Sequence, residues 1–506
     1  MARSKIFSGD LPELLDKIMR YCNDISTLYS CILVNRTWCR IAIPLLWEDP
    51  FSFHDHRIID CHLRNSSEND KMKLKEYGIK NDLSSNTLFN YPSFIKCLDT
   101  QDLLYCINKW VASTSSTLIN SLNSTRLIYK LLFKIFIENE ANLHTFKVEI
   151  GRDRNLIELI LQNSNFINNV KNLLIQVFPR NADNLTKTEK DTIIEHTSRM
   201  INSQKNLKKI NFRSIESFLY DSLLSLKNSN CSNTLKTIMF YNVNFGNILI
   251  IKEVFEHLNV LESIHMIYCR SLNSGFIQQI NNINKPFKLR SLFIGNSRSY
   301  QINSIQLLLQ KSGIYLENFG FNFEYNGSKK ILKLITKYCT RIKFLELPGF
   351  INRKIYSVFD LIKSIGQNLN YLDIIFHGMY IDYYGEELTK ISSTILKSLG
   401  KFLPLRIKYL HLFLYDITAK DFEIFLRSSH KTFIEKLLIN YIKTEDKDIL
   451  PNLLDKYIIK RKRVRYLGFI DDLFYLEEEY KSYNVIIKDY YDLVHTGFYD
   501  CINEWY

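Results

Sequence analysis

The sequence predicts an α/β protein in which an N-terminal three-helix module precedes a solenoid of strand–helix repeats that build a curved parallel sheet. The first observation is a motif of three apolar residues, with the second three positions after the first and the third two positions further on. The motif occurs twelve times from Leu143 onward, and all but three of the eleven intervals between copies are 26 to 28 residues long. The second observation is that apolar residues between the copies recur every three or four positions, which predicts a helix after each strand.

Length and composition exclude several classes of protein. The chain has 506 residues, which is too long for a single ordinary hydrophobic core. Its 46% apolar and 24% charged residues are typical of a folded globular protein. No uncharged apolar run reaches the roughly 18 residues of a membrane span, and no apolar stretch of a secretory signal follows the N-terminal charges. The ten cysteines form no Cys-x-x-Cys pair, which favours reduced thiols in a cytoplasmic or nuclear protein.

The first 50 residues predict three short helices. Asp10 can cap the first helix, and Pro12 suits its first turn. The apolar face of this helix is formed by Leu11, Leu15 and Ile18. The pattern continues in the next two helices with Leu28, Cys31, Val34 and Trp38. Because three short helices enclose too small a core to hide all of these side chains, the module is expected to dock on a partner.

The stretch from Leu11 to Trp47 resembles an F-box, with Leu-Pro at its start, the segment 28–39 in its middle and Pro-Leu-Leu-Trp at its end. The resemblance implies binding to the Skp-type adaptor of an SCF (cullin–RING) ubiquitin ligase, and through that adaptor to a cullin. By the same resemblance, the adaptor interface or its immediate support consists of Leu11, Pro12, Leu15, Ile18, Leu28, Cys31, Val34 and Trp38. The alternative is a plain three-helix cap on the repeats.

Residues 51–140 predict a connecting region, which begins with loops and returns to helical apolar spacing from Phe94 onward. Four residues near its start are of types that bind zinc, namely His54, His56, Cys61 and His62. Their spacing matches no pattern of two ligand pairs, so ordinary loop and strand-edge residues are the preferred interpretation. We therefore expect no metal site here.

The repeats are expected over residues 141–480, and the aromatic-rich residues 481–506 are expected to cap the last repeat. The copy Leu261-x-x-Ile264-x-Met266-x-x-Cys269-x-x-Leu272 carries a resemblance to the leucine-rich repeats of the long type, which implies strands along the concave side of the solenoid. Two intervals of 37 and 38 residues predict insertions that include residues 181–189 and 382–387. The alternative, a doubly wound α/β domain, would show a Gly-rich phosphate loop, and none is present.

The concave face should be lined by the strand positions between and just after the buried apolar pair. Over the nine repeats that begin between residues 235 and 464, seven of these 27 positions are aromatic and three are charged. A nucleic-acid groove needs Lys and Arg facing phosphates, whereas an aromatic, charge-poor surface is typical of a protein interface. The predicted substrate-binding residues are Tyr241, His265, Phe293, Phe344, Tyr371, Tyr409, His411, Phe413 and Tyr466. The alternative is that some of these rings pack against neighbouring repeats.

The formal net charge of +13 is then expected away from the concave face. The densest basic run, Lys460 to Arg465, has the composition of a nuclear import signal or of an anion-binding patch. The preferred interpretation is a solvated helix end that nearby acidic residues neutralise.

No motif of a catalytic site occurs, and we expect neither an enzyme nor a cofactor. The F-box resemblance predicts a substrate-recognition adaptor of an SCF ubiquitin ligase, in which the N-terminal module docks on the Skp-type adaptor and the repeats bind a target protein for ubiquitination. A non-catalytic leucine-rich-repeat scaffold or sensor with no ligase role is the alternative.

Overall fold

The computed structural model describes residues 12–21, 25–77, 79, 87–114, 121–151, 153–177, 185–213, 217–246, 248–294, 302–321, 328–348, 355–375, 381–440, 442–443, 449–470, 483–490 and 493–494. The chain divides into two compact units. The N-terminal unit comprises residues 1–236 and 257–260, and the C-terminal unit comprises residues 237–256 and 261–506. The division falls within the predicted repeats.

The N-terminal unit begins with helices and continues with four strands. Its elements are α2 (Pro12–Arg20), α3 (Ile25–Ile32), α4 (Arg36–Leu46), η1 (Pro50–Phe53), α5 (Ile58–Leu63), α6 (Glu68–Glu76), η2 (Tyr91–Phe94), β1 (Cys97–Asp99), α7 (Thr100–Thr114), α8 (Ser121–Glu138), β2 (Thr145–Ile150), α9 (Arg154–Gln162), η4 (Ser164–Phe166), β3 (Asn172–Val177), α10 (Lys187–Asn202), β4 (Lys209–Arg213), η6 (Ser217–Lys227) and α11 (Ser229–Thr234).

The C-terminal unit continues the alternation of strands and helices. Its elements are β5 (Thr237–Tyr241), α12 (Ile251–His257), β6 (Ser263–Ile267), α13 (Ser274–Asn281), β7 (Leu289–Ile294), α14 (Ile302–Ser312), η7 (Gly313–Tyr315), β8 (Asn318–Phe321), α15 (Ser328–Tyr338), β9 (Phe344–Pro348), α16 (Ile355–Ile365), β10 (Tyr371–Ile375), α17 (Ile381–Leu399), β11 (Arg406–Phe413), β12 (Ile417–Thr418), α18 (Ala419–Ser428), β13 (Phe433–Ile439), β14 (Ile442–Lys443), α19 (Ile449–Leu454), the π-helical turn η9 (Asp455–Ile459), β15 (Val464–Phe469) and β16 (Ile486–Ile487).

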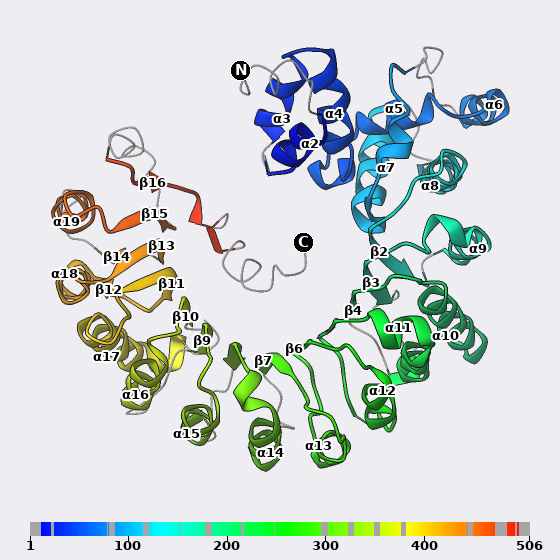
Figure 1. The fold of residues 1–506 in the computed structure, drawn as a ribbon. Coiled ribbons are helices and arrows are strands. Elements are labelled where there is room, and N and C mark those ends of the chain that lie inside the picture. Colours follow the sequence, from blue (N-terminus) through cyan, green and yellow to red (C-terminus); the bar gives the residue numbers. More distant parts are fainter. Residues whose placement is uncertain are drawn as a thin grey trace. The chain divides into compact units, whose positions relative to one another are not determined.

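Within the described residues, fourteen strands belong to the parallel sheet, and in each unit they follow one another in chain order. The short strands β12 and β14 form a separate pair. In each unit the repeat helices lie on one face of the sheet (Figure 1). The opposite face is called the strand face below. No helix within the described ranges is both long and apolar enough to cross a bilayer.

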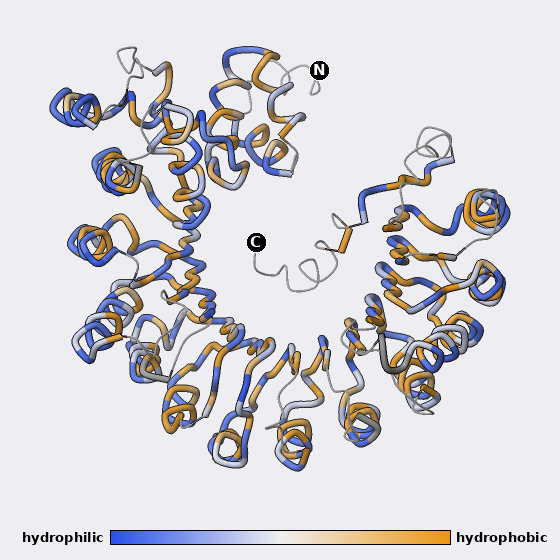
Figure 2. Tube along the Cα trace, turned by 180° about the vertical axis from the view of Figure 1, so that it is seen from behind, coloured by the Kyte–Doolittle hydropathy of each residue, from blue (hydrophilic) through white to orange (hydrophobic). Residues whose placement is uncertain are grey.

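The predicted strand–helix repeats are confirmed. Each of the twelve motif copies falls on one strand, from β2 to β11 and on β13 and β15, and the second and third apolar residues of every copy are buried. Apolar positions recur along these strands (Figure 2), as expected for a sheet that is covered by helices on one face. Each described repeat packs its apolar side against its neighbours, because a single repeat cannot bury that side on its own.

The structure adds three details to the sequence-based expectation. The helical spacing predicted from Phe94 onward is interrupted by the strand β1, and α7 begins only at Thr100. The two long intervals between motif copies contain lengthened helices, because α10 has 16 residues and α17 has 19. Of the predicted insertions, residues 382–387 lie inside α17, and residues 181–184 lie outside the described part of the chain.

The three N-terminal helices enclose a small core of their own. Its buried residues are Leu15, Met19, Leu28, Cys31, Ala42 and Leu46. Asn35 caps α4, because its side-chain oxygen accepts a hydrogen bond of 2.9 Å from the backbone N–H of Trp38. No disulfide joins any of the eight cysteines that the structure describes.

Glycine at position 400 is required by close packing after α17. A Cβ atom there would meet the hydroxyl of Ser428 and lie 2.7 Å from the backbone nitrogen of Ser429. The Gly400→Ala variant should therefore lose about 1–3 kcal/mol of unfolding free energy, measured by urea unfolding followed by circular dichroism. Gly275→Ala is the matched control, because its Cβ would meet only Asn273 Oδ1 at 3.5 Å and an alanine favours α13 by about 0.5–1 kcal/mol. Equal effects of the two substitutions would contradict this packing.

Candidate functional site

The strand face of the C-terminal unit carries a ladder of aromatic side chains. Parallel pairing in register sets Phe344, Tyr371 and Tyr409 side by side on β9, β10 and β11. Ring centroids are 5.9 Å apart for Phe344 and Tyr371, and 6.2 Å apart for Tyr371 and Tyr409. The ring of Phe293 lies against Gly320 of β8, which has no side chain, and its centroid is 5.5 Å from that of Phe344.

These rings are packed against one another and are not an open aromatic surface, which corrects the exposure expected from the sequence. His265, Phe293, Phe344, Tyr409 and His411 are at most 3% exposed. Among the other predicted substrate-binding residues, Tyr241, Tyr371, Phe413 and Tyr466 are half-buried. Two clusters account for the burial. The first contains Met239, Ile267, Phe293 and Phe344 with Tyr241, Tyr268 and Tyr371 around them, and the second contains Tyr409, Leu438, Tyr490 and Leu493 with Tyr371, Phe413, Tyr466 and Val494. The role of the nine predicted residues in binding a substrate stays a prediction.

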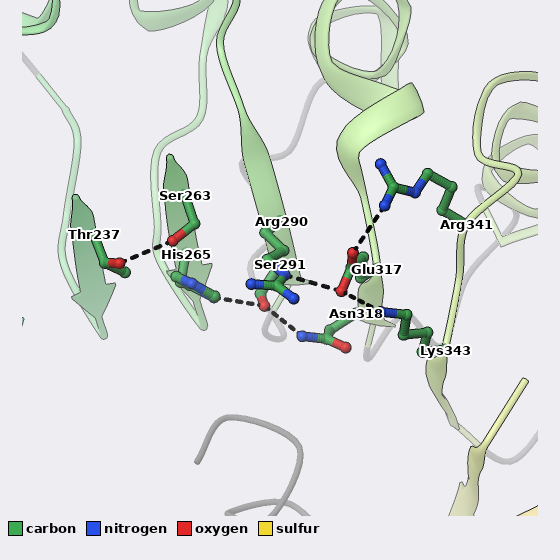
Figure 3. Close-up of polar contacts among 9 residues, drawn as sticks. All are labelled: Thr237, Ser263, His265, Arg290, Ser291, Glu317, Asn318, Arg341 and Lys343. Carbon is green, nitrogen blue, oxygen red and sulfur yellow. Dashed lines mark hydrogen bonds and ion pairs between the residues drawn. The ribbon is translucent and has the colours of Figure 1, made fainter. Parts of the chain in front are cut away.

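A row of hydrogen-bonded polar residues runs across the strands β5 to β8 (Figure 3). Ser263 donates to Thr237 over 3.1 Å, and Asn318 Nδ2 donates to the hydroxyl of Ser291 over 2.8 Å. The same hydroxyl lies 2.7 Å from Nδ1 of His265, so Ser291 joins strands β6, β7 and β8. Buried polar groups keep a fixed geometry when each has a partner, and this row therefore holds the strands in register.

Directly before the start of strand β8, Glu317 contacts three basic side chains (Figure 3). Arg290 Nε donates to it over 2.9 Å, Lys343 Nζ over 3.0 Å and Arg341 over 3.4 Å. Burial alone would raise the pKa of Glu317, but the hydrogen bonds from Lys343 and Arg290 outweigh it and hold the pKa below its ordinary value. Glu317 is only 7% exposed, so this ionised carboxylate is a structural anchor of β7, β8 and β9.

A second acid on the strand face behaves in the opposite way. Burial, and secondarily the nearby charge of Asp373, raise the pKa of Glu346 to about 8, although a hydrogen bond of 3.1 Å from the hydroxyl of Tyr268 favours the ionised form. Burial also raises the pKa of Tyr268. At neutral pH the Tyr268–Glu346 pair is therefore mostly uncharged, in keeping with its aromatic surroundings.

Next to this pair, a carboxylate, an imidazole and a phenol lie in line. Asp373 Oδ1 lies 2.8 Å from Nδ1 of His411, without the alignment of a hydrogen bond. On the other side of the ring, Nε2 of His411 is hydrogen-bonded over 2.6 Å to the hydroxyl of Tyr490. This arrangement holds the hydroxyl of Tyr490 within an otherwise apolar cluster. Motif spacing could not reveal it, because Tyr490 follows His411 by 79 positions.

The predicted adaptor-binding residues fall into three groups. Pro12, Ile18 and Val34 are exposed, with values of 44% for Ile18 and 52% for Val34. Leu15, Leu28 and Cys31 are buried in the core of the module, and Trp38 is half-buried against it. Leu11 lies outside the described residues. The role of these residues in binding an adaptor stays a prediction.

Sequence reasoning missed a second apolar stripe on the N-terminal helices. Leu14 is 43% exposed, Ile25 is 37% exposed and Tyr29 is 61% exposed. Tyr21 and Leu33, which flank the helices, are 88% and 86% exposed. The signal was present as the spacing of Leu14, Ile18 and Tyr21 and of Ile25, Tyr29 and Leu33, which repeats every three or four residues beside the buried stripe.

Basic residues gather at the starts of successive strands in the N-terminal unit. Three exposed lysines directly precede strands β3, β4 and β5, namely Lys171, Lys208 and Lys236. Backbone hydrogen bonds of 2.8 Å link their positions in one row that starts at His144. Burial lowers the pKa of His144, and the charges of Lys171 and Lys96 lower it further. This row concentrates positive charge at the starts of these strands.

The basic run near residue 460 is partly structural. Arg463 is 5% exposed and donates to the backbone carbonyls of Leu426, Ser429 and Tyr457 over 2.7 Å each. Lys460 lies 2.6 Å from a carboxylate oxygen of Asp455. The acids first expected to balance this run, residues 471–479, lie outside the described residues.

The histidines considered as zinc ligands lie in different surroundings. His62 is fully buried against the rings of Trp47, Phe51 and Phe136, and burial lowers its pKa to about 3. His54 Nε2 instead lies 3.1 Å from Asp102. Within the described ranges no three His, Cys, Asp or Glu side chains form a group that could hold a metal ion.

Searches of the sequence against family models and against curated proteins find no match.

Proposed function

We propose that this protein is a substrate-recognition subunit of an SCF ubiquitin ligase, in which the N-terminal helices dock on a Skp-type adaptor and the repeats bind a target protein. The observation that carries the proposal is the exposed apolar surface on α2 and α3, which contains Leu14, Ile18, Ile25 and Tyr29. An apolar surface of this kind on a small helical module favours a protein partner. The F-box resemblance names the partner as a Skp-type adaptor.

The chain's part in such a ligase is to supply proximity. The adaptor and cullin bring the ubiquitin-charged enzyme, and the repeats hold the target close to it, so that transfer becomes effectively intramolecular. This role requires two separate binding surfaces on one chain. The helical surface formed by α2 and α3 and the strand face of the C-terminal unit are the two candidates.

The Leu14→Asp/Ile18→Asp variant should lose adaptor binding. Both side chains are more than 40% exposed, so charges there leave the buried core of the module in place. Burial of two such side chains at an interface is worth about 3–6 kcal/mol, and we expect affinity to fall at least about a hundredfold. The measurement is co-purification and titration of the full chain with a Skp-type adaptor, such as that of yeast or human cells.

The matched control is Leu405→Asp, which places the same charge on a leucine that is 75% exposed in the C-terminal unit. It should bind the adaptor as the wild type does. Undiminished adaptor binding by the Leu14→Asp/Ile18→Asp variant, or no binding by the wild type, would reject the ligase role. That result would favour the alternative, a leucine-rich-repeat scaffold or sensor whose helices only cap the repeats.

A further inference from the structure

The C-terminal segment of the chain lies on the strand face where a target protein was expected. Tyr490 and Leu493 are 4% and 3% exposed, and they share one apolar cluster with Tyr409 of β11 and Leu438 of β13. The sequence had predicted only a cap over the last repeat. The observed contacts reach past β15 and cover two further strands.

The segment is held by a specific polar contact. The hydroxyl of Tyr490 is hydrogen-bonded over 2.6 Å to Nε2 of His411, and the two rings meet edge to face with centroids 5.6 Å apart. Asp373 lies on the far side of the imidazole, 2.8 Å from Nδ1. A phenylalanine would fill the same space but leave the buried imidazole nitrogen without this partner. The site therefore selects tyrosine.

Close approach of the backbones shapes the rest of the site. A Cβ atom at Gly468 of β15 would lie 3.0 Å from Cδ1 of Leu493 and 3.5 Å from Cα of Tyr490. Only glycine leaves this space for the segment, and Leu438 forms its other wall. Tyrosine and leucine three positions apart thus occupy a site that is built from β11, β13 and β15.

The segment has little regular structure to hold it. Its pairing with β15 extends over only Ile486–Ile487. Within the described residues it is also attached through the buried side chains of Val485 and Ile487 and through Lys488, which lies 5.6 Å from the ring of Tyr466. Contacts of this kind are available to any peptide with the same side chains, and the covalent link favours the chain's own copy through its high effective concentration.

We propose that the strand face of the C-terminal unit binds partner segments with a tyrosine followed three positions later by a leucine, and that the chain's own Tyr490 and Leu493 occupy this site until such a segment displaces them. This inference rests on the proposed function for the nature of the partner as a target protein. It adds the chemical class of that target and makes the C-terminal segment a resident competitor.

The test uses the full chain and a fluorescein-labelled peptide with the sequence of residues 485–494. In the Tyr490→Ala/Leu493→Ala variant the site is vacated, and the peptide should bind at least tenfold more tightly than it binds the wild type. The same peptide with phenylalanine in place of Tyr490 should bind this variant several-fold more weakly. Adding Gly468→Val to the variant should abolish binding, because the new side chain fills the space of Leu493.

Circular dichroism and thermal unfolding establish that each variant is folded. If the double variant unfolds, the single Tyr490→Phe variant takes its place, because its segment keeps the ring but loses the hydrogen bond to His411 and is easier to displace. Equal binding by the wild type and the vacated variants, no binding by a folded vacated variant, or indifference to Gly468→Val would each overturn the proposal. Adaptor binding depends on α2 and α3 and is measured in parallel. Its loss in the Leu14→Asp/Ile18→Asp variant is independent of these outcomes, so that the two proposals fail separately.

Discussion

Replacing Glu346 with glutamine should flatten the pH dependence of stability that the wild-type protein shows between pH 5 and pH 9. In the folded protein the pKa of Glu346 is about 8, against an ordinary value of 4.5, first because of burial and then because of Asp373. Between these two values the folded state retains a proton that the unfolded state has released. Raising the pH therefore favours unfolding, by at most about 1.4 kcal/mol for each pH unit.

The sign of this effect is opposite to that of a salt-bridged acid. Below pH 4.5 the Glu346 carboxyl is protonated in both states and contributes no pH dependence, whereas above pH 8 it is ionised in both and the full loss of stability is present. Glutamine has the shape of the protonated acid and accepts the hydrogen bond from Tyr268, but it never ionises. The Glu346→Gln variant should match the wild type near pH 5 and exceed its unfolding free energy at pH 9.

Glu317→Gln is the matched control on the same sheet. The pKa of Glu317 is lowered, since the hydrogen bonds from Lys343 and Arg290 outweigh the effect of burial. Its ionised form therefore stabilises the fold above pH 4.5, and this contribution is lost as the pH falls through its folded pKa. Between pH 5 and pH 9 the Glu317→Gln variant should be less stable than the wild type by a constant amount, about 1–3 kcal/mol.

Urea unfolding followed by circular dichroism at pH 5, 7 and 9 distinguishes the two carboxyl groups. A Glu346→Gln variant whose stability falls with pH as steeply as that of the wild type would show that Glu346 is ionised at neutral pH. In that case the aromatic ladder would have to hold a negative charge beside Asp373.

The repeat architecture was readable from the sequence because its physical cause is local. A strand that is buried on one face needs apolar side chains at alternate positions, and a helix that covers it needs them every three or four positions. Both periods are visible in every copy of the motif, and all twelve copies became strands. The missed strands β1 and β16 have three and two residues, too few to show a period of two.

The state of the strand face could not be read in the same way. Alternation shows that Phe344 and Tyr409 point away from the helices, but it does not show what covers them. The cover comes from neighbouring strands across Gly320 and from a segment some 80 residues further along the chain. Such contacts depend on three-dimensional proximity and leave no periodic signal.

In the N-terminal module, the sequence pattern predicted the buried core but not the exposed apolar surface. Its order of helices and its core at Leu15, Leu28 and Cys31 followed from the apolar pattern. The exposed stripe with Leu14 and Tyr29 was overlooked because two adjacent apolar stripes on one helix look like a single broad one. Only the packing of α2 against α4 decides which stripe is inside.

Replacing Arg463 with methionine should cost about 3–5 kcal/mol of unfolding free energy in the C-terminal unit. The guanidinium donates to three buried carbonyls, of Leu426 and Ser429 at the end of α18 and of Tyr457 in η9. Methionine keeps the apolar volume of the stem but leaves these carbonyls without their donor, at about 1–3 kcal/mol each before local relaxation. The positive charge at the C-terminal end of α18 is lost as well.

The Arg463→Lys variant tests whether the planar, forked arrangement of donors on the guanidinium is needed, or only its positive charge. Burial, and secondarily the charge of Arg461, lower the pKa of Arg463 to about 10, so the guanidinium stays protonated at neutral pH. An ammonium group is also charged there, yet it has no planar fork to reach α18 and η9 together. We expect this variant to lose about half as much stability as Arg463→Met.

The control for both is Arg465→Met, two positions further along, where the side chain is exposed and stacks on the ring of Tyr466 at 5.2 Å. Its effect should stay within about 0.5 kcal/mol, since exposed substitutions without buried partners change stability little. The comparison separates charge from structure in the basic run. Equal losses at positions 463 and 465 would mean that the run acts through its summed charge, whereas the expected difference assigns Arg463 to the folding of the last repeats.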